Sequence, residues 1–228
     1  MVGMGEKGIV MAYIYVSEAE CKRYRNDCAR ILKEVCTTLK REGISAQFSL
    51  IGSGSRNMVT RNGDGPYDLD YNLEIIKAQE EYWHDLWRLK EKVRRALNDA
   101  EGAEYFDDAH DSTSCLNAIL YFEDSSNIEF SFDVAIITKN ENGDYMRLIH
   151  NKGLILLNGH EQFTWNEVRK SSRVKEKTDA LKHEHLWQEV RDRYLELKNM
   201  YLRRNDNNHP SFIVYVEAVN EIYNKYFD

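Results

Sequence analysis

The sequence predicts an α+β protein in which helices flank a mixed or antiparallel sheet and a helical hairpin forms the C-terminal region. Three observations support this fold class. Residues 17–43 have the apolar spacing of a long amphipathic helix, residues 103–151 contain short β-rich runs, and the last third returns to helical spacing. The chain has 228 residues, of which 42% are hydrophobic and 11% aromatic. This composition suits a folded globular protein with a sizeable core.

The first long helix is predicted to begin at Ser17. Ser17 and Glu20 form a capping-box pattern, in which each side chain accepts a hydrogen bond from the backbone N–H of the other residue. Gly43 supplies the stop. The preceding apolar run, Ile9–Val16, is too short for a membrane span and is expected to be a strand or a lead into the helix. The apolar stripe of the helix consists of Tyr24, Cys28, Ile31, Leu32, Val35 and Leu39.

The middle of the chain alternates between strands and one further helix. The helix is predicted over Ala78–Ala100, with Gly102 after its end. Glu123–Asn127 has the length and composition of a hairpin turn, and Asn142-Gly143 favours a second tight hairpin. The strand candidates are Ile44–Ile51, the run that contains Asp68 and Asp70, Cys115–Phe122, Ile128–Thr138 and Tyr145–Ile149.

The last third is predicted to be helical. The basic stretch Val168–Lys177 precedes or opens a helix that runs to about Arg204. A second helix over Pro210–Phe227 has proline in its first turn, where the missing N–H costs nothing. Because the short polar segment Asn205–Asn208 separates the two, we expect them to form an antiparallel pair.

Charge and cysteine content narrow the class of protein. The net charge of −7 argues against a protein whose main task is to coat duplex nucleic acid, since that affinity comes from Lys and Arg. The four cysteines form no C-x-x-C pair, which favours buried, reduced thiols. No apolar run is long enough to span a bilayer. We therefore expect a cytoplasmic protein without a membrane partner.

A glycine- and serine-rich bend followed by two acidic residues marks the candidate site. Strand side chains alternate between faces, so Asp68 and Asp70 are expected to present two carboxylates side by side. Such carboxylates repel each other, and Mg²⁺ is the usual compensation. The bend Gly52–Ser55 lets the backbone approach phosphates closely. Together they predict a site for a Mg²⁺-nucleoside triphosphate. The alternative is a tight turn followed by a strand with a solvated acidic edge.

These residues resemble the signature of the DNA polymerase β-type nucleotidyltransferase superfamily. The signature is a Gly-Ser pair, either Gly52-Ser53 or Gly54-Ser55, followed by a loop and Asp68-Leu69-Asp70 on a hydrophobic strand. Within the superfamily, the similarity is closest to the branch of oligoadenylate synthases, cyclic GMP–AMP synthase and their bacterial relatives, and it extends over Leu50–Thr138. It implies a nucleotidyltransferase-like catalytic core over residues 1–165, with helices of residues 166–228 packed on it.

The resemblance also implies a third carboxylate, on a later strand antiparallel to the first pair. Asp133 fits, because Glu129, Ser131 and Asp133 share the polar face of a predicted strand. Asp68, Asp70 and Asp133 would then hold two Mg²⁺ ions, with Mn²⁺ as the alternative metal. The implied reaction transfers a nucleoside monophosphate from a nucleoside triphosphate, such as ATP, to a hydroxyl acceptor and releases pyrophosphate.

Two further groups of residues are candidates for the triphosphate. The bend supplies Gly52, Ser53, Gly54 and Ser55, with Arg56 as a weaker charge-neutralising candidate. The basic stretch supplies Lys170, Ser171, Arg173 and Lys175, for which the alternative is a solvated face of mixed charge.

The acceptor and the activity itself have alternatives. The acidic net charge favours a small molecule or a nucleotide over a long nucleic acid as acceptor. The competing function is a non-catalytic nucleotide sensor or interaction module of the same fold, and a third is a hydrolase that uses the same carboxylates.

Overall fold

A computed structural model of the chain describes residues 12–100, 109–121, 128–156, 159–168 and 172–227. The chain divides into two compact units, which we describe separately. The core unit consists of Val16–Val59 and Pro66–Lys170. The C-terminal unit consists of Met1–Tyr15, Thr60–Gly65 and Ser171–Asp228. The expected division at residues 165 and 166 stays a prediction.

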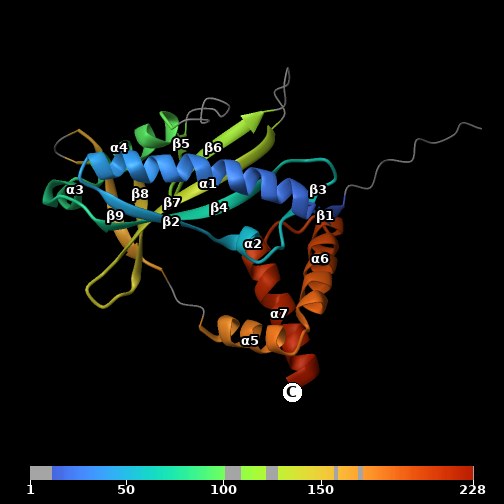
Figure 1. The fold of residues 1–228 in the computed structure, drawn as a ribbon. Coiled ribbons are helices and arrows are strands. Elements are labelled where there is room, and N and C mark those ends of the chain that lie inside the picture. Colours follow the sequence, from blue (N-terminus) through green and yellow to red (C-terminus); the bar gives the residue numbers. More distant parts are fainter. Residues whose placement is uncertain (1–11, 101–108, 122–127, 157–158, 169–171, 228) are drawn as a thin grey trace, which may run out of the picture. The chain divides into compact units, whose positions relative to one another are not determined.

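A seven-stranded mixed sheet forms the centre of the core unit (Figure 1). The strand order is β2-β4-β7-β6-β5, and β8 pairs with both β7 and β9. Strands β4 and β7 are parallel, whereas the other pairs in this sheet are antiparallel. The predicted fold class is confirmed. The strands are β2 (Ser45–Leu50), β4 (Tyr67–Lys77), β5 (His110–Asp111), β6 (Leu116–Tyr121), β7 (Ile128–Lys139), β8 (Tyr145–Ile155) and β9 (Glu161–Glu167).

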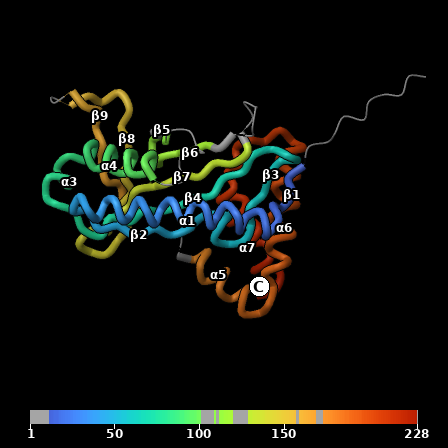
Figure 2. Tube along the Cα trace, turned by 45° about the horizontal axis from the view of Figure 1, so that its top comes forward, coloured from blue at the N-terminus to red at the C-terminus, as the bar shows by residue number. Residues whose placement is uncertain are grey.

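Helices α1 (Glu18–Arg41) and α4 (Leu86–Asn98) pack on one face of this sheet (Figures 1 and 2). The face is apolar because alternate strand residues point to it. On β4 these are Tyr67, Leu69, Tyr71, Leu73 and Ile75, all buried. The six predicted stripe residues of α1 are buried against them. The residues between them therefore form the opposite, polar face, which includes Asp68 and Asp70.

The cap of α1 offers a test of local stability. The Ser17 hydroxyl accepts a hydrogen bond of 3.2 Å from the backbone N–H of Glu20, as predicted. Ser17→Ala is expected to lower the free energy of unfolding by about 1 kcal/mol, because an N–H of the first turn loses its acceptor. Urea unfolding measures this. Thr37→Ala removes a hydroxyl that bonds the Lys33 carbonyl within the same helix, and is expected to be nearly neutral. Equal losses in both variants would contradict the capping role.

Two predicted helices are each interrupted. The helix expected over Ala78–Ala100 is α3 (Glu80–His84) followed by α4, because Asp85 leaves the helical conformation and its side chain caps α4 through the N–H of Arg88 at 3.0 Å. The helix expected to continue to Arg204 breaks after α5 (Ser172–His183). His185 there has a φ of 59°, and α6 (Trp187–Arg203) begins two residues later.

Strand predictions near β8 were incomplete. The Asn142-Gly143 hairpin is confirmed, with Gly143 at a φ of 80° and Lys139 opposite Tyr145. However, β8 continues to Ile155 and pairs with β9, a strand that the sequence did not predict. The turn predicted at Glu123–Asn127 lies outside the described residues, although β6 and β7, on either side of it, are antiparallel as expected.

The C-terminal unit contains a β-ribbon and three helices. Strands β1 (Tyr13–Tyr15) and β3 (Thr60–Asn62) pair antiparallel. Helices α6 and α7 (Ser211–Phe227) form the predicted antiparallel hairpin, since Glu189 pairs with Lys225 and Tyr201 with Glu217. Phe212 and Tyr226 have the apolar spacing of one face of α7, but each is 46% exposed. The buried stripe is Val214, Tyr215, Ala218, Val219 and Ile222.

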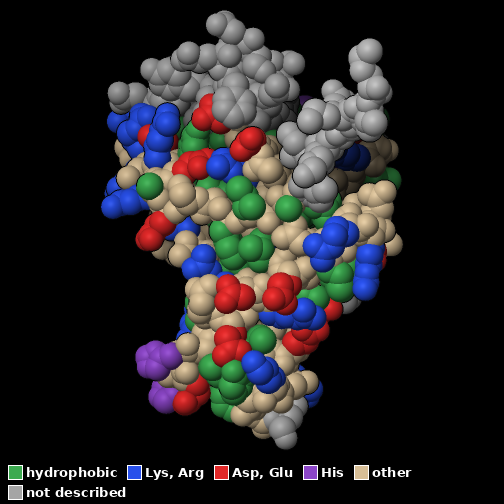
Figure 3. Space-filling model, turned by 90° about the vertical axis from the view of Figure 1, so that its right-hand side faces the viewer, with side chains coloured by type: hydrophobic (Ala, Val, Ile, Leu, Met, Phe, Trp, Pro, Cys, Tyr) green, Lys and Arg blue, Asp and Glu red, His purple; other side chains and the backbone are tan. Residues whose placement is uncertain are grey.

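Charges of both signs are mixed on the surface. On the face in Figure 3, Lys and Arg side chains lie among Asp and Glu side chains. Ion pairs such as Lys175–Asp179 at 2.8 Å and Lys139–Glu74 at 3.2 Å follow this pattern. In the part of the chain that the structure describes, no helix has the length and apolarity that crossing a membrane requires.

Candidate functional site

Strands β4 and β7 bring the predicted carboxylates together on the polar face. Asp70 is opposite Asp133 in the strand register, and Asp68 is opposite Ser131. Neighbouring strands are about 4.8 Å apart, so Asp70 and Asp133 are adjacent side chains. The two strands are parallel, which corrects the antiparallel arrangement expected from the sequence. Parallel strands need a long crossover, and α3, α4, β5 and β6 provide it.

A glycine lies directly against the Asp70 carboxylate. The Ile51 N–H donates to the Asp70 carbonyl at 2.8 Å, which fixes the end of β2 beside β4. Gly52 follows with a φ of 61°, and a Cβ atom placed there would lie 2.2 Å from Asp70 Oδ2. Both the backbone conformation and the contact therefore require glycine at this position.

The predicted Gly-Ser loop is a short helix, α2 (Gly52–Ser55), and its two Gly-Ser pairs have different surroundings. Gly54 is buried, and a Cβ atom there would lie 2.9 Å from Leu50 and 3.0 Å from Leu69. The Ser55 hydroxyl donates to the Gly52 carbonyl at 3.0 Å, and Arg56 Nη1 donates to the same carbonyl at 2.8 Å. Gly52-Ser53 is thus the pair beside the carboxylates, whereas Gly54 faces the core.

The acidic neighbours of Asp70 alter its protonation. Burial and, to a smaller extent, the charges of Asp68 and Asp133 raise the pKa of Asp70 to about 6, whereas Arg147 and Arg56 act in the opposite direction. A carboxyl group with two negative neighbours resists ionisation. Glu74, on the same face, forms an ion pair with Lys139 at 3.2 Å. The site therefore concentrates negative charge around Asp70.

Three residues near the carboxylates were missed in the sequence. Arg147 on β8 is close enough to Asp70 to lower its pKa. Asn117 Nδ2 on β6 donates to Asp133 Oδ1 at 2.5 Å. Burial, and more weakly the charge of Asp133, raise the pKa of the Cys115 thiol. The sequence could have indicated Asn117, because it is a polar residue within an apolar strand. Arg147 had none, because β8 was predicted to end soon after it and β9 was not predicted.

The donor set suits a hard divalent cation. Carboxylate oxygens are the ligands that Mg²⁺ prefers, and a cation would relieve the repulsion expressed in the raised pKa of Asp70. Among the described residues, no three His, Cys, Asp or Glu side chains are placed as a group to hold a metal ion. Mg²⁺ does not need such a group, since it binds through one or two carboxylates, several waters and substrate phosphates.

The candidates from the basic stretch remain predictions. Lys170 and Ser171 lie outside the described residues. Arg173 and Lys175 lie on α5 in the C-terminal unit, where Lys175 pairs with Asp179. The ion pair agrees with the alternative of a solvated face for Lys175.

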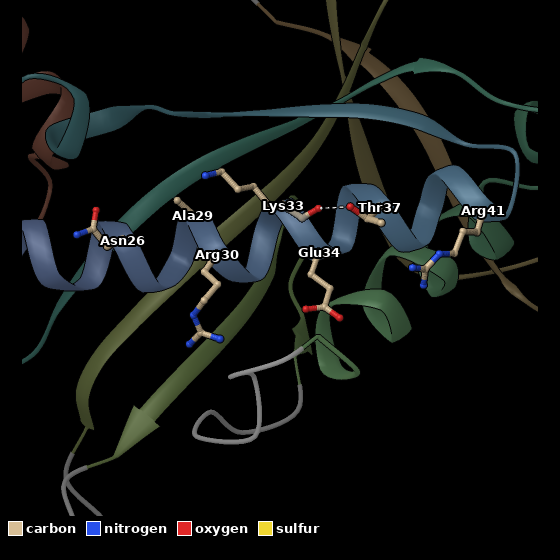
Figure 4. A pocket seen from close by; sticks show the side chains of 7 residues that line it. All are labelled: Asn26, Ala29, Arg30, Lys33, Glu34, Thr37 and Arg41. Carbon is tan, nitrogen blue, oxygen red and sulfur yellow. Dashed lines mark hydrogen bonds between the residues drawn. The ribbon is translucent and has the colours of Figure 1, made fainter.

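A surface pocket of about 630 Å³ lies elsewhere, along the outer side of α1 (Figure 4). It contains none of the predicted site residues. Its lining comes entirely from α1, which covers the apolar face of the sheet. The residues are Asn26, Ala29, Arg30, Lys33, Glu34, Thr37 and Arg41.

Solved structures resemble this chain in fold. No protein-family model matches the chain, and no curated protein matches its sequence. A STING-associated CdnE c-di-GMP synthase from Capnocytophaga granulosa is 15% identical with a TM-score of 0.60, over 93% of this chain and 63% of that one. A mutant of the Vibrio cholerae di-nucleotide cyclase DncV, in complex with ATP and GTP, is 9% identical with a TM-score of 0.60, over 96% and 71%. CdnC from E. coli MS115-1 with ATP is 14% identical with a TM-score of 0.53, over 92% and 62%.

The chain thus spans between 62% and 71% of the length of these three proteins. At such low identity the similarity concerns the fold. It agrees with the resemblance predicted from Gly52-Ser53, Asp68, Asp70 and Asp133. The protein shares its fold with these solved structures, which include a c-di-GMP synthase and a di-nucleotide cyclase.

Proposed function

We propose that the protein is a Mg²⁺-dependent nucleotidyltransferase, which transfers a nucleoside monophosphate from a nucleoside triphosphate to a hydroxyl group and releases pyrophosphate. The observation that supports this most strongly is the row of Gly52, Asp70 and Asp133 across adjacent strands, with Asp68 on the same face. Phosphoryl transfer needs a place where a phosphate can approach the backbone closely, which glycine provides. It also needs ligands for a metal ion, which the carboxylates provide.

In the proposed site, different residues bind the metal, bind the phosphates, accept the proton and supply positive charge. Asp68, Asp70 and Asp133 would hold two Mg²⁺ ions, which when bound neutralise phosphate charge and lower the pKa of the acceptor hydroxyl. Gly52 and Ser53 bind the β and γ phosphates through the backbone and the hydroxyl. Asp133 accepts the proton of the attacking hydroxyl. Arg56 and Arg147 add positive charge near Asp70, where the triphosphate would otherwise meet only carboxylates.

A nucleotide is the acceptor class that we propose first. The solved structures of similar fold include a c-di-GMP synthase and a di-nucleotide cyclase with ATP and GTP, and a dinucleotide product contains one nucleotide joined to another. The net charge of −7 likewise favours a small acceptor over a long nucleic acid.

The raised pKa of Asp70 predicts the pH dependence of transfer. Because metal binding requires the ionised carboxylate, activity is expected to fall about tenfold for each pH unit below about 6, the pKa of Asp70. Arg147→Gln is expected to move this midpoint to higher pH, since Arg147 lowers that pKa. Lys139→Gln removes a charge paired with Glu74 and serves as the control. Initial rates from pH 5 to 8 measure the effect, and an unchanged midpoint in Arg147→Gln would contradict the assignment.

The activity itself is tested with all four nucleoside triphosphates, each labelled at the α-phosphate. The protein is incubated with Mg²⁺ and cell extract, and the labelled product is identified by mass. The proposal predicts a product in which the α-phosphate is joined to an acceptor hydroxyl, together with released pyrophosphate. Release of inorganic phosphate alone would indicate a hydrolase. Binding of the Mg²⁺-nucleotide with no product under any acceptor would indicate the non-catalytic sensor.

A further inference from the structure

Asn117 is an amide inside an otherwise apolar strand. On β6 it lies between Leu116 and Ala118, both buried. The strand is paired on both sides, since Asn117 is opposite His110 of β5 and Asp133 of β7. Asparagine is disfavoured in strands, and a polar side chain inside a sheet needs a hydrogen-bond partner. Asn117 is half-buried on the same face of the sheet as Asp133, so its amide can reach that carboxylate.

The partner of this amide is a proposed metal ligand. Asn117 Nδ2 donates to Asp133 Oδ1 at 2.5 Å. The last torsion of an aspartate side chain is broad, so an unanchored carboxylate samples many rotations. Asp133 also has Asp70 opposite it on the neighbouring strand, and like charges push the two carboxylates apart. The amide holds one oxygen of Asp133 against both effects.

A second polar side chain lies near the same carboxylate at the start of β6. The Cys115 thiol interacts electrostatically with Asp133 and lies 3.0 Å from the Ser112 hydroxyl. The Cys115 N–H donates to that hydroxyl at 3.1 Å, which fixes the turn that presents the thiol. The carboxylate therefore has the Asn117 hydrogen bond on the side of β6 and Asp70 on the side of β4.

We propose that Asn117 is a positioning residue, which orients the Asp133 carboxylate for metal binding in the proposed nucleotidyl transfer. Outer hydrogen bonds of this kind fix the orientation of a metal-binding carboxylate, and their loss costs about 10- to 100-fold in metal affinity. The inference rests on the proposed function only in taking the group bound by Asp133 to be a metal ion. The orientation of Asp133 is a property of the metal-free chain.

The first test compares crystal structures of the full chain without metal. In the wild type, Asp133 is expected in one orientation with Oδ1 bonded to Asn117. In Asn117→Leu, which keeps the side-chain size but lacks the donor, the carboxylate is expected to rotate or to occupy several orientations. If Asp133 keeps its wild-type orientation in the variant, the proposal is wrong, whatever the metal affinity.

The second test measures Mn²⁺ binding by electron paramagnetic resonance. Asn117→Leu and the smaller Asn117→Ala are expected to raise the Kd for Mn²⁺ at least about tenfold. The control, Asn151→Leu, removes an amide of β8 that donates to Thr164 at 3.2 Å, and should leave the Kd unchanged. A Kd within twofold of wild type in folded Asn117 variants would overturn the proposal. If the wild type binds no Mn²⁺, the proposed metal-dependent function fails, and the crystal structures still decide the role of Asn117.

Discussion

Asp70→Asn is expected to abolish nucleotidyl transfer and, at the same time, to stabilise the fold. The variant removes a metal-binding carboxylate, so we expect a loss of at least about 1,000-fold in kcat/KM, or about 4 kcal/mol of transition-state stabilisation. It also removes the repulsion from Asp68 and Asp133. The folded-state pKa of about 6 exceeds the ordinary 3.8, so ionisation of Asp70 destabilises the native state.

The pH window of this stabilisation follows from the direction of the shift. The cost of ionising Asp70 is absent below its ordinary pKa of 3.8, grows as the pH rises, and is complete above about 6. At pH 7.5 the variant is expected to gain up to about 3 kcal/mol, since the pKa of Asp70 rises by about two units and one unit corresponds to about 1.4 kcal/mol.

Thermal melts at pH 7.5 and pH 4 measure this difference, and the gain should largely disappear at pH 4. Glu141→Gln, at the exposed β7–β8 turn, is the control for charge removal and should change neither activity nor stability. Undiminished label transfer by Asp70→Asn would refute the catalytic assignment. A lower melting temperature at pH 7.5 would refute the electrostatic one.

Gly52→Ala is expected to cause the second large effect. The new Cβ atom would lie 2.2 Å from Asp70 Oδ2, so the carboxylate must move, and the φ of 61° adds about 1 to 2 kcal/mol of backbone strain. Because a displacement of about 1 Å costs roughly 100-fold in rate, we expect transfer to fall by at least that factor. Activity and urea unfolding are measured together.

Gly143→Ala separates strain from contact. Gly143 has a similar left-handed conformation, with a φ of 80°, but a Cβ atom there meets nothing within 4 Å. This variant should lose about the same backbone energy and keep full activity. If both variants keep wild-type activity, the contact between Gly52 and Asp70 has no role in the reaction.

The sequence predicted which face of its strand each acidic side chain occupies, but it did not predict how the strands around the site pair. Strand alternation was sufficient to place Asp68, Asp70 and Asp133 on polar faces, because the side-chain period of a strand is independent of its neighbours. Sequence alone does not specify which strands become neighbours. The parallel pairing of β4 with β7 depends on the crossover through α3, α4, β5 and β6, and this was predicted wrongly.

The residues that the sequence missed are those whose role depends on cross-strand contacts. Asn117 matters because it is opposite Asp133, and Arg147 because β8 brings it near Asp70. The break at Asp85 had a local signal, since aspartate is a favoured N-cap, but the continuous apolar pattern on both sides concealed it. Local patterns thus predicted the acidic side chains, and tertiary pairing supplied the groups that hold them.

Pyrophosphate release from Mg²⁺-nucleoside triphosphates tests the central claim most directly. The wild type and Asp133→Asn are compared with and without Mg²⁺, and pyrophosphate is measured separately from inorganic phosphate. The account predicts Mg²⁺-dependent pyrophosphate release by the wild type and its loss in Asp133→Asn. Release that is equal in the two proteins, or the appearance of inorganic phosphate alone, would contradict it.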